Sequence, residues 1–178
     1  MKYIVIVPLL FLFSGCVFTP PSSTVDEQVE IYEETESSPE KIDLSTQDLL
    51  VDSDSEKVLS LAFAQVGTPY VYGGVDYTGF DCSGFVGYVY RNAINKNLPR
   101  TSRNMSNYTF HLDRNQLRPG DIVFFDTSLK GHINHCGIYM GNGRFIHASS
   151  GKAHSVTTSN IDKGFYKNRF RWGGRVSK

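Results

Sequence analysis

One cysteine and two histidines have the types and the spacing that a thiol nucleophile requires. Cys82 lies in the hexapeptide FDCSGF at residues 80–85, and His135 and His147 follow in two apolar segments. A thiol attacks a carbonyl carbon as the thiolate, an imidazole can accept its proton, and a further polar group must orient that imidazole. The sequence therefore predicts a cysteine hydrolase.

The residues around Cys82 predict that its thiol lies in the first turn of a helix over residues 81–94. Asp81 is a favourable N-cap, and the apolar residues that follow recur at helical spacing. The unpaired N–H groups and the dipole of a helix N-terminus favour negative charge, so they lower the pKa of a thiol placed there. Gly84 and Gly87 reduce helix propensity, and we expect close approach of another backbone or of substrate to explain them. A buried structural cysteine is the alternative interpretation.

Helical patterns precede strand patterns along the chain. Ser53 and Glu56 form a capping-box pattern that predicts a helix over 54–66, and a third helix starts near Ser102. A loop rich in Gly and Tyr over 70–79 leads into the helix of the cysteine. Helices followed by an antiparallel sheet predict an α+β fold, in which a helix supplies the nucleophile and the sheet supplies the base. The predicted strands cover residues 121–126, 135–140, 144–148, 155–158 and 170–176.

The spacing of the two histidines constrains the hairpin that carries them. Opposed residues of an antiparallel hairpin share a face, and their numbers have a constant sum. His135 and His147 share a face only if that sum is even, which requires an odd number of loop residues. A three-residue loop over 141–143 meets this condition, whereas a two-residue turn needs a compensating bulge. With this parity Cys136 faces the core, so we expect a buried free thiol that does not pair with Cys82.

Six short motifs follow one another after residue 56: YVYGG (70–74), DCSGF (81–85), LPRTS (98–102), LRPGD (117–121), HCGIY (135–139) and FIHAS (145–149). In order and spacing they resemble the NlpC-like family of bacterial cell-wall cysteine peptidases, over residues 56–176. The resemblance implies a papain-like α+β fold and a D,L-endopeptidase that hydrolyses a peptide bond in peptidoglycan stem peptides or cross-links. Cys136 departs from the pattern, because the family usually has an aliphatic residue there.

The resemblance also implies roles for individual residues. It makes Cys82 the nucleophile, His135 the base and His147 the orienting residue, and it places Tyr70 where it helps to position the thiol or the oxyanion. No cofactor or metal is implied, and we expect a monomer.

Three polar residues near the motifs have two interpretations each. Asp81 and Ser83 either cap the helix only or also bind the amino end of the substrate, as in some members of the family. Arg100 either meets a substrate carboxylate or has a structural role. The remaining histidines, which belong to none of the motifs, are expected at the surface: His111, His132 and His154.

Three other functions are compatible with parts of the pattern. A thiol-dependent amidase or acyltransferase would use the same triad on another envelope substrate. A metal site would use Cys82, Cys136, His135 and His147, but adjacent ligands such as His135 and Cys136 would point to opposite faces of a strand. A non-catalytic wall-binding lipoprotein would not require the intact triad.

The formal net charge of zero hides an asymmetry. Residues 17–54 contain eleven Asp or Glu and one Lys, whereas residues 61–178 contain fifteen Lys or Arg and six Asp. A basic domain suits an anionic partner such as a carboxylate-rich wall polymer. Nucleic acid is not expected, because the chain has no basic helix and no interleaving of basic and aromatic residues.

The first residues have the pattern of a targeting segment. Lys2 precedes an apolar stretch over 3–13 that is too short to span a bilayer. The segment ending at Cys16 resembles a bacterial lipoprotein signal, which predicts a signal peptide over 1–15 and a lipid (palmitate-containing) anchor on Cys16; an ordinary secretory signal is the alternative. Val17 then implies the outer membrane, facing the periplasm, if the source has one.

The remaining chain divides into two parts. Residues 16–54 are rich in Ser, Thr, Pro and Glu, which predicts an acidic flexible tether with at most a short helix over 43–51. Residues 55–178 form the predicted peptidase domain.

Overall fold

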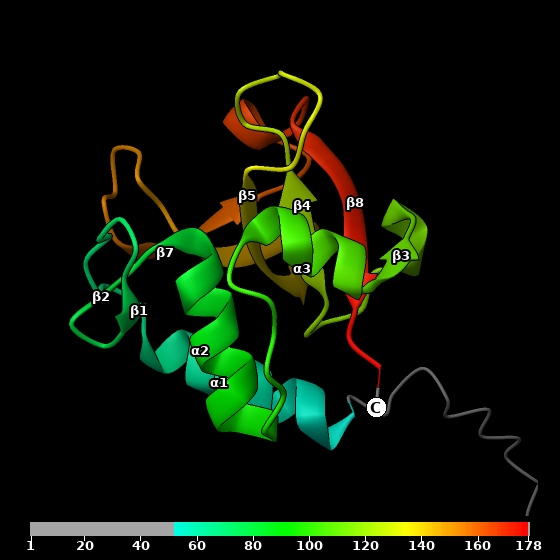
Figure 1. Cartoon of the computed structure of the whole chain (residues 1–178). Coiled ribbons are helices and arrows are strands. Elements are labelled where there is room, and N and C mark those ends of the chain that lie inside the picture. The colour runs from blue at the N-terminus through cyan, green and yellow to red at the C-terminus, as the bar shows by residue number, and fades with distance from the viewer. Residues whose placement is uncertain (1–51, 178) are drawn as a thin grey trace, which may run out of the picture. The chain divides into compact units, whose positions relative to one another are not determined.

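The computed structural model describes residues 52–177 of the chain (Figure 1). The expected signal peptide, the acylated Cys16, nearly all of the tether and the short helix over 43–51 lie outside the described residues. Within residues 52–177, no helix has the length and apolar character needed to cross a membrane.

The helices that the sequence predicts are present: α1 (Ser53–Ala64), α2 (Cys82–Ile94) and α3 (Ser102–Tyr108). The Asp81 carboxylate caps α2 by accepting the N–H of Gly84 at 2.7 Å, as predicted. The predicted capping box of α1 is wrong. A capping box would require Ser53 to be the N-cap. Asp52 is the N-cap instead and Ser53 is the first helical residue, so the Ser53–Glu56 pattern lies one residue too late.

A six-stranded antiparallel sheet forms the second layer, with strand order β3-β8-β4-β5-β6-β7. The five strands predicted from the sequence are present, which confirms the α+β class, and one edge strand was not predicted. A small hairpin, β1 (Val75–Asp76) with β2 (Gly79–Phe80), lies within the segment predicted as a loop. The strands of the sheet are β3 (Phe110–Leu112), β4 (Ile122–Phe125), β5 (His135–Gly141), β6 (Arg144–Ala148), β7 (Val156–Asn160) and β8 (Phe170–Arg175).

The two faces of the sheet belong to different apolar clusters, because successive strand residues point to opposite sides. The helices cover one face, where α1 and α2 pack on the sheet (Figure 1). The helix-facing cluster includes Val58, Phe85, Val86, Val89, Phe124, Cys136, Ile138 and Ile146. A smaller cluster on the other face contains Val123, Phe125, Tyr139, Phe145 and Ile161.

The β5–β6 hairpin corrects the predicted loop and keeps its parity. Residues 142–143 form a two-residue turn, in which Asn142 and Gly143 have φ values of 52° and 72°, so the predicted three-residue loop is wrong. A register shift between Tyr139 and Gly141 marks a bulge. Beyond this bulge, the numbers of two opposed residues again have an even sum. The two histidines therefore share a face of the sheet, because the bulge supplies the residue that the turn lacks. The pairs that define the register are Ile138 with Ile146, Tyr139 with Phe145 and Gly141 with Arg144.

Close backbone approach explains one of the two glycines in α2. The Gly74 carbonyl accepts the N–H of Asp81 at 3.0 Å and occupies the place that a Cβ at position 84 would need. Gly87 has no such neighbour, since the nearest atom to a Cβ there would be Met105 Cε at 3.7 Å. Close backbone approach is thus confirmed for Gly84 and absent at Gly87, which lines the pocket described below, where approach of substrate stays a prediction.

Candidate active site

The Cys82 thiol is half-buried at the first residue of α2. A hydrogen bond with the Cys136 thiol, and a hydrogen bond and positive charge from His135, hold the pKa of Cys82 well below its ordinary value. Burial and the negative charge of Asp81 act in the opposite direction. The net effect favours the thiolate, which is the form that attacks carbonyl carbon.

The two histidines form a hydrogen-bonded pair. His135 Nε2 lies 2.9 Å from His147 Nδ1, and the two rings are perpendicular. Because Nε2 of His135 is used in this way, its Nδ1 is the ring nitrogen that remains for Cys82. His147 is fully buried, and burial together with the charge of His135 lowers its pKa well below the ordinary value. His147 is therefore neutral at physiological pH.

A hydroxyl group contacts the outer nitrogen of the histidine pair. His147 Nε2 lies 3.0 Å from the hydroxyl of Ser159, a half-buried residue of β7. In the β6–β7 register, Phe145 opposes Ser159 and His147 opposes Thr157, so the contact runs diagonally across the two strands on one face. Ser159 was not predicted from the sequence, because a serine in the run TTSN carries no motif.

Aromatic rings enclose the histidine pair. Tyr166, from the 3₁₀ helix η3 (Gly164–Tyr166), stacks on His135 with ring centroids 5.9 Å apart and meets His147 edge-on at 5.2 Å. Phe125 and Phe145 contact the same two rings from the sheet. Burial raises the pKa of Tyr166 to about 12; the charge of Cys82 adds to the rise and a hydrogen bond with the Ser149 side chain opposes it. These rings bury His147 completely and leave His135 partly accessible. Sequence reasoning missed Tyr166, which lies in no motif.

Tyr70 lies beside the thiol. Burial, and then the negative charges of Cys82 and Asp81, raise its pKa, so its hydroxyl remains a hydrogen-bond donor. The ring of His154 approaches Tyr70 with a centroid distance of 5.6 Å. His154 is exposed, as expected, but it contacts the site.

The other two histidines do not reach the site. His111 is exposed and stacks on Trp172 at 5.1 Å, and His132 lies in the loop before β5. Both are at the surface or partly exposed, in line with the sequence analysis.

Both oxygens of the Asp81 carboxylate accept hydrogen bonds from groups within the protein. Arg100 donates to both of its oxygens, at 3.1 and 2.6 Å, and the N–H groups of Gly73 and Gly84 donate at 3.1 and 2.7 Å. Ser83 donates to Asp81 at 3.2 Å and accepts from Arg100 at 3.0 Å. Burial acts to raise the pKa of Asp81, but these donors outweigh it and lower that pKa. The arrangement agrees with a capping and structural role for Asp81.

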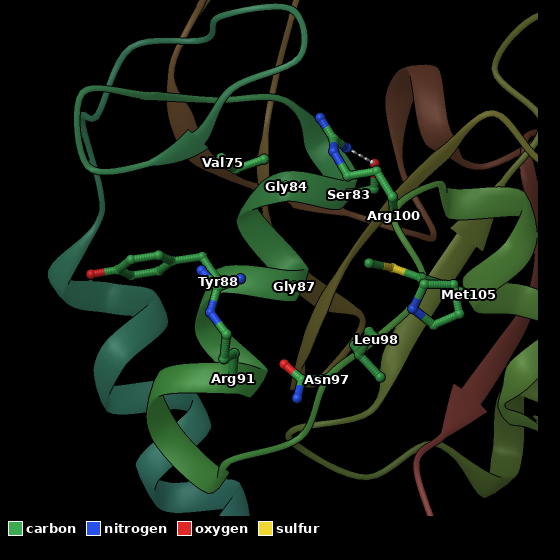
Figure 2. Close-up of a pocket in the computed structure, with 11 residues that line it drawn as sticks. Val75, Ser83, Gly84, Gly87, Tyr88, Arg91, Asn97, Leu98, Arg100 and Met105 are labelled. Carbon is green, nitrogen blue, oxygen red and sulfur yellow. Dashed lines mark hydrogen bonds between the residues drawn. The ribbon is translucent and has the colours of Figure 1, made fainter.

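A small pocket opens next to the start of α2. Its volume is about 100 Å³, enough for a side chain or a carboxylate rather than for a large ligand. Figure 2 shows Arg100 beside Ser83 at the start of the helix and Arg91 further along it. No acidic residue lines the pocket within the described part of the chain. The lining residues are Val75, Ser83, Gly84, Gly87, Tyr88, Arg91, Asn97, Leu98, Pro99, Arg100 and Met105.

Cys136 is fully buried and free, as predicted, but it is not separated from the nucleophile. Cys136 forms no disulfide with Cys82, as predicted, but the two cysteines belong to one apolar cluster and Cys136 helps to lower the pKa of Cys82. The reason is that α2 packs on the face of the sheet to which Cys136 points. Burial, and then Cys82, raise the pKa of Cys136 well above its ordinary value, so Cys136 keeps its proton and donates it. Among residues 52–177, no cluster of three or more His, Cys, Asp or Glu side chains could hold a metal ion.

Comparison with known proteins places this geometry in a family. The NlpC/P60 family matches residues 67–175 of the chain. The chain is 40% identical over 109 residues to the probable endopeptidase NlpC of Escherichia coli (strain K12), which covers 61% of this chain and 69% of that protein. It is 40% identical over 106 residues to the murein DD-endopeptidase MepH of the same organism, which covers 55% of this chain and 38% of MepH.

A solved structure gives the same result. The crystal structure of an NlpC/P60 family protein from Bacillus cereus ATCC 10987 matches with a TM-score of 0.64 and 28% identity, over 68% of this chain and 40% of that one. The match with MepH and the match with the Bacillus cereus protein therefore each span less than half of that relative. The family match covers more than half of this chain and includes Cys82, both histidines and the sheet that carries them. The chain belongs to the NlpC/P60 family of cell-wall peptidases.

Proposed function

We propose that this chain is a peptidoglycan hydrolase, a D,L-endopeptidase that cleaves a peptide bond in stem peptides or cross-links by a Cys-His-His mechanism. The observation that carries the proposal is the series of contacts from Cys82 through His135 to His147. A thiol with a depressed pKa, a base in contact with it and a buried partner for that base are the parts that covalent acyl transfer needs. The name of the MepH relative, a murein DD-endopeptidase, supports peptidoglycan as the substrate class, and the name of the NlpC relative supports endopeptidase activity.

In the first half of the reaction, the Cys82 thiolate attacks the carbonyl carbon of the scissile bond and a C–S bond forms. The C–N bond then breaks, and the His135 imidazolium gives its Nδ1 proton to the leaving amine. In the second half, neutral His135 takes a proton from water, and the resulting hydroxide equivalent displaces the thiolate. The products are an amine and a carboxylic acid, and the enzyme returns to its thiolate–imidazolium state.

The start of α2 supplies donors for the oxyanion. The N–H of Gly84 bonds the Asp81 side chain and that of Phe85 bonds the Asp81 carbonyl. The N–H groups of Cys82 and Ser83 have no intrahelical acceptor, as is general for the first residues of a helix. They are available to stabilise negative charge that develops at the reacting carbonyl, and the protonated Tyr70 hydroxyl adds a further donor.

The pocket beside Ser83 suits an anionic part of the substrate. It is lined by Arg91 and by Arg100, which is paired with Asp81, and by no acidic side chain within the described residues, so we assign to it a carboxylate of the stem peptide that Arg91 would meet. Binding of a substrate amino group by Asp81 is less favoured, because such a group would have to displace Arg100.

Digestion of purified sacculi tests the proposal. The wild-type chain should release peptide fragments whose masses, read by liquid chromatography and mass spectrometry, identify the cleaved bond. Cys82→Ala should release none while keeping the wild-type circular dichroism spectrum. Hydrolysis that survives in a folded Cys82→Ala protein would refute the thiol mechanism. Sacculus binding by the wild type without hydrolysis would favour a non-catalytic wall-binding protein.

We also propose that residues 1–15 are a signal peptide, that Cys16 carries the lipid anchor, and that residues up to 54 tether the domain to the outer membrane. The support is the sequence pattern alone, since residues 1–51 lie outside the described part of the chain, and residues 53–54 already belong to α1. Metabolic labelling with an alkyne-bearing palmitate should mark the wild-type chain and leave Cys16→Ser unlabelled. Label on both would refute acylation at Cys16.

A further inference from the structure

The outer nitrogen of His147 has a defined partner in a dry site. His147 is 0% exposed, its Nδ1 lies 2.9 Å from His135 Nε2, and its Nε2 lies 3.0 Å from the Ser159 hydroxyl. The rings of Phe145 and Tyr166 pack against the imidazole, with centroids at 4.8 and 5.2 Å. Ser159 is therefore the polar group that satisfies Nε2 in this enclosure.

A neutral imidazole carries its proton on one nitrogen only, so His147 has two tautomers. Whenever His135 is an imidazolium, both of its nitrogens are donors, and His147 must accept at Nδ1. The proton of His147 then lies on Nε2, and the Ser159 oxygen must accept it. The other tautomer would direct the Nδ1–H of His147 at the Nε2–H of His135, so it opposes the protonated state of the base.

We propose that Ser159 is a positioning residue that holds His147 in the Nε2–H tautomer and thereby presents a bare Nδ1 to His135. The inference rests on the proposed Cys-His-His function and extends it from a triad to a four-membered series that ends on the outer strand β7. The serine oxygen is needed because an imidazole N–H that is buried without an acceptor is unfavourable. Without that oxygen, the tautomer with its proton on Nδ1 gains population.

The strand register provides a matched control. Thr157 lies on the same face of β7 as Ser159 and directly opposes His147 in the register, yet the hydroxyl that contacts His147 Nε2 is that of Ser159. Thr157→Val removes a neighbouring hydroxyl at nearly constant volume. Ser159→Ala removes the proposed acceptor, and Ser159→Thr keeps it on a residue that suits a strand.

Long-range ¹H–¹⁵N correlation spectra of the full chain, with ¹⁵N-labelled histidine, report which ring nitrogen carries the proton, and loss of signals in a His147→Asn sample assigns them. In the wild type and in Thr157→Val, we expect Nε2 of His147 to be protonated and Nδ1 bare. In Ser159→Ala, we expect a mixture of tautomers and a fall in kcat/KM on wall fragments of about three- to tenfold, the loss that corresponds to one buried hydrogen bond. Ser159→Thr should restore both readouts.

Two results would overturn the inference. One is a wild-type His147 with its proton on Nδ1, and the other is a Ser159→Ala protein that keeps the wild-type tautomer. If Ser159→Ala does not fold, as judged by circular dichroism, Ser159→Cys replaces it, because sulfur is a weak acceptor of similar size. If the wild type shows no Cys82-dependent hydrolysis, the proposed function fails, while the tautomer spectra still decide the role of Ser159.

Discussion

The Cys136 thiol should lower the pKa of the nucleophile by a measurable amount. Cys136 is fully buried, it keeps its proton, and its hydrogen bond is the largest single influence on the pKa of Cys82. Cys136→Ala removes the donor. Cys136→Ser has nearly the size of alanine and restores an O–H donor, so the two variants differ mainly in the hydrogen bond. We expect the pKa of Cys82 to rise in the alanine variant and to stay low in the serine variant.

The size of the rise follows from the strength of a charge-assisted hydrogen bond. Such bonds contribute roughly 1.5–3 kcal/mol, and an S–H group is a weak donor, so the lower end of this range applies. With about 1.4 kcal/mol per pKa unit, the loss corresponds to a rise of about one unit. His135 still contacts Cys82 in the variant, and this contact keeps the pKa below the value of a free thiol.

The rate of alkylation by iodoacetamide as a function of pH measures this pKa. Peptide mass spectrometry assigns the modification to Cys82 and separates it from Cys136. The midpoint of the profile is the quantity to compare, because a thiolate of higher pKa is intrinsically more nucleophilic and partly offsets the loss of rate. Equal midpoints in the wild type and in Cys136→Ala would refute the reasoning, and so would a serine variant whose midpoint matches that of alanine.

Three further predictions concern residues around the site. His147→Asn and His147→Gln should retain more kcat/KM than His147→Ala, because an amide oxygen still accepts from the base; equal losses in all three would contradict the orienting role. Burial opposes ionisation of Asp126, but three hydrogen bonds and one arginine lower its pKa to about 2. The ionised Asp126 therefore contributes fully to the free energy of unfolding above the ordinary pKa of an aspartate. This contribution is lost as the pH falls toward 2. Asp126→Asn should therefore lower the urea midpoint at pH 7, and the difference should shrink at pH 3. Gly84→Ala should lower the melting temperature because its methyl group meets the Gly74 carbonyl, whereas Gly87→Ala, with room for a methyl group, should stabilise α2 by about 0.5–1 kcal/mol. Equal melting temperatures for the two alanine variants would show that the backbone contact has no energetic weight.

Much of the fold could be predicted because the relevant signals are local. A capping aspartate followed by helical spacing located the start of α2 at Cys82, and apolar runs between turn residues located five strands. The short elements that were missed, β3 and the β1–β2 hairpin, have too few residues to show a period. The length of the turn at 142–143 was predicted wrongly because a two-residue turn with a bulge and a three-residue loop both place the two histidines on one face. The spacing of the histidines in the sequence does not distinguish these two arrangements.

The residues of the candidate site also fall into those that the sequence predicts and those that only the structure shows. The sequence singled out Cys82, His135 and His147, because the side chain of a nucleophile, a base or an orienting group must be of a particular type. The partners of those groups were found only in the structure: Ser159 from the outer strand, Tyr166 from a 3₁₀ helix and Cys136 beneath the nucleophile. A serine, a tyrosine or a second cysteine has no distinctive spacing when its role is to contact a residue from another element.

The sequence by itself therefore determined which candidate groups are present and where they lie locally: a thiol at a helix N-terminus, and two histidines on one face of a hairpin. The tertiary structure decided how each of those groups is completed. It directed Arg100 onto Asp81, so that a carboxylate that could have met the substrate is occupied, and it brought Cys136 against Cys82 by packing α2 on that face of the sheet. Hydrogen bonds between elements depend on strand register and on helix packing. Those are properties of the whole fold, and no segment of the chain encodes them alone.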